Sequence, residues 1–315
     1  MNELALRRPR TIKELERMWE DFWDDDARAR GLAFTPRPSD VIITPFSKCG
    51  TTLLQHIAHG LRSGGSLDFD EINAVSPWIE IAEDVGWDLD AEQGATPRLF
   101  KSHAAFTDIP KGARYIVAFR HFNDAFVSLY RFFEGWFFEP GCIGIDELAR
   151  WRFAPEKVAD QGYFHHLASW WEQRANPDVL LLCYEDMIAD IPQTVARVGE
   201  FLGIAHDAEL FALVSRQASR DFMLGISDKF NERHLVEKGG ARAGLPPPID
   251  SKKVTAGARD DARYRLRPEL REMFAGYWRE IITARFGFAN YEALRRAVAE
   301  ENYKPLRPAF STASS

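Results

Sequence analysis

Four short runs of aliphatic and β-branched residues recur along the chain. They lie at about residues 40–44, 98–101, 114–119 and 179–183. Continuous apolar runs of this length are typical of strands that are covered on both faces. Helical periodicity fills much of the sequence between them, which predicts parallel strands joined by helical crossovers. The expected fold class is therefore α/β, with a central parallel sheet flanked by helices on both faces.

Apolar residues at helical spacing predict six helices. These are expected from Thr11, over about 50–62, 124–136 and 163–174, from near Pro192, and from Pro268. The first helix opens with a capping box of Thr11 and Glu14, and its aromatic stripe is interpreted as core packing. Residues 64–97 are irregular and predict loops and short helices. Residues 205–267 are polar and rich in Gly, Pro and Arg, which predicts loops laid over a site.

A chain of 315 residues can form one or two domains, and α/β folds of this length are often single. We expect one α/β domain over 40–302, with loop and helix insertions over the site. Residues 1–39 are expected to form an N-terminal helical extension packed on that domain, and 303–315 a flexible tail.

Charge and cysteine content narrow the possible partners and the compartment. The chain has 40 Lys+Arg and 47 Asp+Glu, a formal net charge of −7, which argues against nucleic acid as a partner. Cys49, Cys142 and Cys183 fit neither a disulfide framework nor a four-ligand zinc site. No apolar run is long enough to span a membrane, and the N-terminus lacks a signal peptide. A cytoplasmic protein without a membrane partner is expected.

The loop after the first predicted strand reads Thr44-Pro-Phe-Ser-Lys-Cys-Gly-Thr-Thr52 and leads into a helix. Such a junction presents backbone N–H groups and the positive end of a helix dipole to an anion. Lys48 adds a positive charge, and Thr51 and Thr52 add hydroxyl donors. The order differs from the Walker A pattern because Lys48 precedes Gly50. The loop indicates a phosphate cradle, with an ordinary strand-to-helix turn as the alternative.

The other three predicted strands also end on polar residues. Residues 101–103 (Lys-Ser-His) follow the second strand, Arg120 the third and Tyr184 the fourth. Ligands of open parallel sheets gather beyond the carboxyl ends of the strands, so we expect these side chains to share one site. Arg120 and Ser128 are spaced to converge on one phosphate, with an Arg120–Asp124 ion pair as the alternative.

Together these motifs resemble the cytosolic-type sulfotransferases that use 3′-phosphoadenosine 5′-phosphosulfate (PAPS). Residues 47–53 (Ser-Lys-Cys-Gly-Thr-Thr-Leu) are similar to the Pro-Lys-Ser-Gly-Thr-Thr-Trp loop of that family, and 101–103 to its Lys-Thr-His segment. Residues 120–128 are similar to its Arg-x-x-x-Asp-x-x-x-Ser signature, and 184–187 to its Tyr-Glu-Asp-Met. The order and spacing agree over about 40–204, which suggests a bacterial-like member with the P-loop-like sheet of that family.

The resemblance implies a role for each matched residue. His103 would be the general base, and Lys48 would stabilise the leaving group. The nucleotide would be held by Lys48, Cys49, Gly50, Thr51, Thr52, Arg120, Ser128 and Tyr184. The family's late Arg-Lys-Gly motif is unclear: residues 237–240 and 252–257 are candidates, and the second is preferred, with Lys253 and Gly257 as its nucleotide contacts. Ser219 is one further nucleotide candidate.

The resemblance implies transfer of a sulfuryl group from PAPS to a hydroxyl or amine of a small molecule, leaving 3′-phosphoadenosine 5′-phosphate (PAP). No metal is implied, and neither the acceptor nor the oligomeric state is indicated. The acceptor pocket is expected to have an apolar wall of Phe46, Trp78, Trp87, Phe106, Trp136 and Phe137. The alternatives are a P-loop small-molecule kinase, which would need Mg²⁺, and a nucleotide-binding protein of this fold without turnover.

Overall fold

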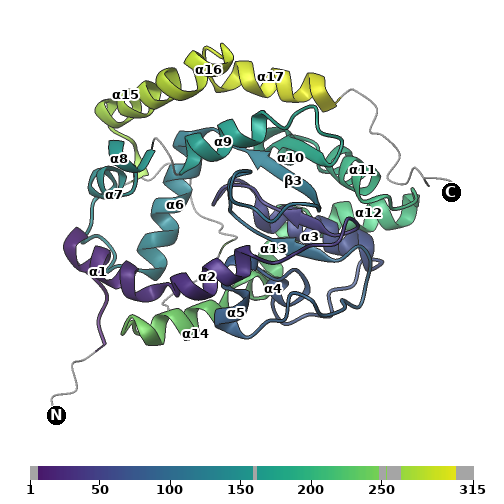
Figure 1. The fold of residues 1–315 in the computed structure, drawn as a ribbon, viewed down its shortest axis with the longest axis horizontal. Helices are drawn as coiled ribbons and strands as arrows, with labels where there is room; N and C mark the ends of the chain where they lie inside the picture. Colours follow the sequence, from purple (N-terminus) through teal and green to yellow (C-terminus); the bar gives the residue numbers. More distant parts are fainter. Residues whose placement is uncertain (1–5, 159–161, 248–252, 254–263, 303–315) are drawn as a thin grey trace.

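A four-stranded parallel sheet forms the centre of the chain (Figure 1). The computed structural model describes residues 6–158, 162–247, 253 and 264–302. The strands are β1 (Val41–Ile43), β2 (Leu99–Lys101), β3 (Arg114–Phe119) and β4 (Val179–Cys183), in the order β2-β1-β3-β4. All three pairings are parallel. The predicted α/β class and all four predicted strands are confirmed, whereas the predicted tail at 303–315 lies outside the described residues.

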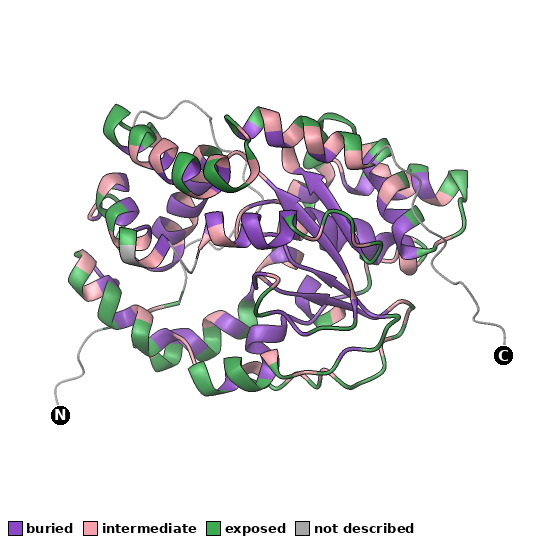
Figure 2. Cartoon of the chain, turned by 45° about the horizontal axis from the view of Figure 1, so that its top comes forward, coloured by how far each residue is buried: buried purple, intermediate pink, exposed green. Residues whose placement is uncertain are grey.

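Helices surround the sheet, and exposed residues gather on their outer faces while the strands lie buried (Figure 2). In chain order they are α1 (Ile12–Phe22), α2 (Asp25–Leu32), α3 (Thr51–Arg62), α4 (Ile72–Val75), η1 (Ile79–Ile81), α5 (Ala82–Val85), α6 (Phe122–Trp136), α7 (Ile145–Arg152), α8 (Pro155–Val158), α9 (Tyr163–Trp171), α10 (Tyr184–Ala189), α11 (Ile191–Leu202), α12 (Ala208–Gln217), α13 (Arg220–Gly225), η2 (Ser227–Phe230), α14 (Arg233–Arg242), α15 (Pro268–Tyr277), the π-helical η4 (Trp278–Thr283), α16 (Ala284–Phe286) and α17 (Tyr291–Asn302). Among the described residues, no helix combines the length and apolarity that crossing a bilayer requires.

Alternation along the strands divides the core in two. Ile42 and Val117 pack with residues of α1, α6, α9 and α15 on one face. Val41, Ile43 and Ile116 pack with α3, α11 and α12 on the other face. The helix after β1 therefore leaves on one face and the helix after β3 on the opposite face. Because β1 and β3 are neighbours, a crevice opens between their carboxyl ends, where α/β proteins bind ligands.

The prediction of loops over 205–267 is wrong for its described part. Helices α12, α13 and α14 occupy residues 208–217, 220–225 and 233–242. The glycine content of this segment led to the prediction of loops, but in the structure glycine allows two helices to pack closely. A Cβ on Gly239 would lie 2.8 Å from Cζ of Phe22, so α14 approaches α1 only because that position lacks a side chain.

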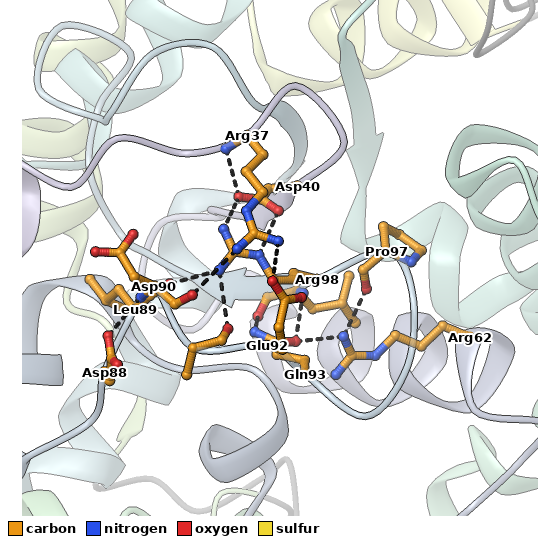
Figure 3. Close-up of polar contacts among 12 residues, drawn as sticks. Arg37, Asp40, Arg62, Asp88, Leu89, Asp90, Glu92, Gln93, Pro97 and Arg98 are labelled. Carbon is orange, nitrogen blue, oxygen red and sulfur yellow. Dashed lines mark hydrogen bonds and ion pairs between the residues drawn. The ribbon is translucent and has the colours of Figure 1, made fainter.

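A buried ion pair joins the amino ends of β1 and β2 (Figure 3). This end of the strands is opposite to the crevice at their carboxyl ends. The Nε and Nη2 atoms of Arg98 donate to the two carboxylate oxygens of Asp40 at 2.9 and 2.7 Å. The backbone N–H of Arg37 donates to the same carboxylate at 2.8 Å. Arg62 supports the adjoining loop by donating to the carbonyl of Pro97 at 2.7 Å.

Replacing Asp40 with Asn should lower the free energy of unfolding by about 3–5 kcal/mol, because the Arg98 guanidinium would stay buried without a counter-charge. Urea titration followed by circular dichroism would measure this loss. The matched control is Glu172→Gln, which breaks an exposed pair with Arg285 and should cost less than about 1 kcal/mol. Equal losses for the two variants would contradict the structural role of the buried pair.

Candidate functional site

A cavity of about 1940 Å³ opens at the carboxyl ends of the strands. Its walls come from the loops after the four strands, from α1 and α6, and from the segment around Glu232. Nine of the predicted site residues line it: Lys48, Gly50, Thr51, Thr52, His103, Arg120, Ser128, Tyr184 and Lys253. The structure therefore confirms the prediction that the residues after the four strands lie around one site.

The loop after β1 turns through two residues with left-handed backbone conformation, which glycine adopts readily and lysine rarely. Lys48 has a φ of +68° and Gly50 a φ of +99°. A Cβ on Gly50 would lie 2.9 Å from Cδ2 of Tyr184, so glycine is required there for space as well as conformation. Helix α3 then begins without a side-chain cap, and the buried Oγ1 of Thr51 has no hydrogen-bond partner among the described residues. These unsatisfied donors make the helix start a site for an anion.

The ammonium group of Lys48 lies in this cavity without a described carboxylate partner. It stands 4.6 Å from the centroid of the Phe132 ring. Burial, followed by the positive charges of Lys253 and Arg120, lowers the pKa of Lys48 to about 7. A bound anion would reverse this shift, since it would favour the ammonium form.

Arg120 connects two of the strand-end loops. Its Nη1 donates to the carbonyl of Lys48 at 2.8 Å, and its guanidinium lies 4.3 Å from the centroid of the Tyr184 ring. The buried Nε atom has no partner among the described residues. The alternative ion pair with Asp124 is not among the described salt bridges, and Ser128 lines the same cavity. Arg120 therefore presents an unsatisfied donor beside the Lys48 loop.

His103 is held in one tautomer by its surroundings. Its Nδ1 lies 2.7 Å from the carbonyl of Pro45, and since a carbonyl only accepts, Nδ1 carries the proton. Nε2 is then left with its lone pair. Burial, followed by the charge of Lys101, lowers the pKa of His103 to about 3, so the ring is neutral at physiological pH. The backbone N–H of His103 donates to Glu80 at 2.7 Å, which fixes the loop that carries the ring.

Lys101, which the sequence places at the end of the second strand, belongs to a buried charge cluster. Its Nζ and that of Lys253 both pair with the same oxygen of Glu232. The Trp78 ring covers Lys101, with its centroid 3.6 Å from Nζ. Burial alone would raise the pKa of Glu232, yet the two ammonium groups hold that pKa below its ordinary value. The sequence gives no signal for Glu232, which lies 131 residues after Lys101.

Three predicted site residues do not face the cavity or lie outside the described residues. The side chain of Cys49 is fully buried in the core, and burial raises the pKa of its thiol to about 12, so it is not a reactive thiol. Ser219 caps α13 by accepting from the N–H of Phe222, although its neighbours Ala218 and Arg220 line the cavity. Gly257 lies outside the described residues.

The apolar wall differs in part from the predicted one. Phe46, Trp78, Trp136 and Phe137 line the cavity as expected. Phe106 instead packs on Trp170 at 5.2 Å, and Trp87 on His234 at 5.6 Å. The aromatic stripe of the first helix, interpreted as core packing, contributes Trp19 and Trp23 to the wall. Further members that the sequence did not indicate are Phe132, Phe133 and Trp151.

Comparison with known proteins gives a consistent result. A family model described as "Sulfotransferase domain" matches residues 38–300. The chain is 33% identical to mouse sulfotransferase 4A1 over 192 residues, which are 58% of this chain and 66% of that protein. It is 29% identical to human sulfotransferase 2A1 over 194 residues, 59% of this chain and 67% of that protein. The match to the mouse protein thus spans just under two thirds of its length.

Solved structures show the same fold at low identity. Retinol dehydratase in complex with androsterone and inactive cofactor PAP aligns with a TM-score of 0.62 at 15% identity, covering 85% of each chain. Mouse sulfotransferase SULT7A1 complexed with PAP aligns with a TM-score of 0.61 at 18% identity, covering 87% of this chain and 92% of the other.

Proposed function

The chain belongs to the sulfotransferase family, and on this premise we propose that it transfers a sulfuryl group from PAPS to a hydroxyl or amine of a small molecule in the cytoplasm. One observation carries the proposal. An uncapped helix start, the cation Lys48 and the neutral imidazole of His103 line a single cavity at the strand ends. This arrangement provides an anion site and a base side by side.

The unsatisfied donors of the site fit the nucleotide. The start of α3, with Thr51, Thr52 and Lys48, suits the 5′-phosphosulfate, because its donors have no other described partner. Arg120 and Ser128 suit the 3′-phosphate, and Tyr184 suits the adenosine end. Two fold neighbours were solved with PAP, which supports PAP as the nucleotide to test at this site.

The proposed reaction needs one proton transfer and one bond exchange. Nε2 of His103 takes the proton from the acceptor hydroxyl, whose oxygen attacks the sulfur of PAPS. The bond between that sulfur and the bridging oxygen breaks, and PAP departs with the bond's electron pair. Lys48 in its ammonium form stabilises the charge that grows on the bridging oxygen. The N–H at Nδ1 goes on donating its hydrogen bond to the carbonyl of Pro45, which keeps Nε2 turned to the substrate.

Isothermal titration calorimetry with PAP, compared with ATP plus Mg²⁺, tests the donor site. We expect PAP to bind tightly without metal, and PAPS to be consumed when acceptors are added. Preference for ATP with Mg²⁺ would contradict the proposal in favour of a kinase. Tight binding of PAP without transfer to a broad panel of phenols, alcohols and amines would contradict the enzymatic part and favour a nucleotide-binding protein.

Arg120→Ala should weaken PAP much more than adenosine 5′-monophosphate, because the guanidinium is proposed to meet only the 3′-phosphate. A charge-assisted contact of this kind contributes about 10- to 100-fold in affinity. Calorimetric affinities of both nucleotides for both proteins measure the difference. The monophosphate serves as the internal control for damage to the Lys48 loop, which Arg120 also contacts. Equal weakening of the two nucleotides would overturn the assignment.

A further inference from the structure

Arg152, the last residue of α7, lines the same cavity on its aromatic side. The neighbouring Trp151 ring lies 6.0 Å from Trp19 and 6.4 Å from Phe133, which places this end of α7 against the apolar wall. Arg152 therefore lies on a different wall from the strand-end loops that carry Lys48 and Arg120.

The guanidinium of Arg152 has no hydrogen bond or ion pair with any described residue. The centroid of the Phe153 ring lies 5.8 Å from its Cζ. The side chain is half-buried, and the loss of hydration on burial lowers the pKa of the guanidinium. A guanidinium that has lost part of its hydration and has no described partner is stabilised when an anion binds to it.

Three acidic side chains that line this cavity have partners other than Arg152. Glu134 accepts from the hydroxyl of Tyr264 at 2.8 Å, and Glu185 accepts from the hydroxyl of Tyr291 at 2.6 Å. Glu232 pairs with two lysines. None of these three carboxylates pairs with Arg152, so its guanidinium can accept a negative group of a ligand.

A second cation, Lys157, contacts Trp151, the residue before Arg152. Nζ of Lys157 donates to the carbonyl of Trp151 at 3.1 Å and stands 5.3 Å from the centroid of the Trp151 ring. Lys157 also lines the cavity and has two further N–H donors. Two cations near an edge-to-face group of aromatic rings suit a ligand that is aromatic and carries a negative group.

Resting on the proposed function, we propose that the acceptors are aromatic hydroxy acids. Arg152 receives the carboxylate, with Lys157 as a second donor. The aromatic body packs on the rings of Trp19, Phe133 and Trp151, and the hydroxyl reaches His103. The carboxylate takes no part in the transfer and serves to orient the hydroxyl, so Arg152 determines specificity and is not catalytic.

Three acids of increasing length test this proposal, each paired with its methyl ester: 4-hydroxybenzoate, 6-hydroxy-2-naphthoate and 4′-hydroxybiphenyl-4-carboxylate. For the acid that fits best, we expect a higher kcat/KM than for its ester. Arg152→Met should lower this acid-to-ester ratio by about 10- to 100-fold, and Arg152→Lys should restore part of it. The matched control is Arg150→Met, an exposed position on the same helix, which should leave the ratio unchanged.

A binding measurement decides the proposal even without turnover. Quenching of tryptophan fluorescence in the presence of PAP should report tighter binding of the acid than of its ester, and Arg152→Met should remove the difference. Esters that bind as well as acids for all three pairs would overturn the inference while leaving the sulfotransferase function intact. Loss of PAP affinity in Arg152→Met would also overturn it, since Arg152 would then serve the nucleotide. Failure of PAP to bind the unaltered protein would instead contradict the proposed function.

Discussion

Replacing His103 with alanine is expected to lower turnover by about 100-fold or more, while PAP binds within a few-fold of the unaltered protein. The size of this loss follows from the proposed role of Nε2 as the proton acceptor. Nδ1 is engaged in a hydrogen bond with the carbonyl of Pro45, which leaves Nε2 available. Because the ring is neutral and its pKa is lowered, its loss removes a proton acceptor and no positive charge from the nucleotide site. Initial rates with PAPS and a phenolic acceptor, with calorimetry of PAP, measure the two quantities.

His165→Ala is the matched control for this prediction. His165 lines the same cavity, but its Nε2 lies 3.3 Å from Oγ1 of Thr107, a contact on the cavity rim. We expect its turnover to stay within a few-fold of the unaltered protein. If His103→Ala turned over as fast as His165→Ala, the base would have to be sought elsewhere.

The sheet could be predicted from the sequence because its strands carry an unusually direct signal. A parallel strand buried on both faces is expected to be apolar throughout, and residues 115–119 and 179–183 satisfy this, with only Arg114 at the start of β3 as a polar exception. Helix α14 could not be predicted, since its stability depends on contact with α1 through Gly239. That contact joins distant parts of the chain, and glycine taken alone indicates a break.

The candidate site also has a part that the sequence predicts and a part that it does not. The strand-end residues Lys48, His103, Arg120 and Tyr184 could be found because topology brings such positions together whatever the side chains are. The aromatic wall could not be separated from the core. Trp19 and Phe22 lie on the same stretch of α1, yet Trp19 lines the cavity and Phe22 lies in the core. Helical spacing does not distinguish a residue that faces a cavity from one that faces another helix.

The pairing of charged side chains in and around the cavity was the least predictable part. Arg152 and Glu232 are ordinary polar residues in the sequence, and only the fold shows that one lacks a described partner while the other pairs with two lysines. Ion pairing between residues that are far apart in the sequence depends on how the helices and loops are packed. The same dependence explains why Cys49, which lies within the anion-binding loop, is an inert core side chain.

Lys48→Met is expected to lower turnover by about 100- to 1,000-fold, the range for losing one donor that stabilises a developing charge. Methionine keeps most of the length of the side chain and removes the charge that lies over the Phe132 ring, so the loss reports the ammonium group. Initial rates at saturating PAPS measure this effect.

The pH dependence of PAP affinity tests the same group without turnover. In the free protein the pKa of Lys48 is lowered to about 7, whereas the nucleotide favours the ammonium form. Below pH 7 the ammonium is already present. Above pH 7 binding must take up a proton, so the affinity should fall with rising pH, approaching tenfold per unit. The phosphates titrate near pH 6 and do not contribute in this range.

Calorimetry of PAP between pH 7 and 9, in buffers of different ionisation enthalpy, measures both the slope and the proton uptake. Lys48→Met should bind PAP more weakly at pH 7 and show neither the slope nor the uptake. The control is Lys157→Met, which leaves the nucleotide side of the cavity unaltered and should retain both. A slope that persists in Lys48→Met would mean that another group takes up the proton, and Lys48 would then lose its proposed part in holding the 5′-phosphosulfate.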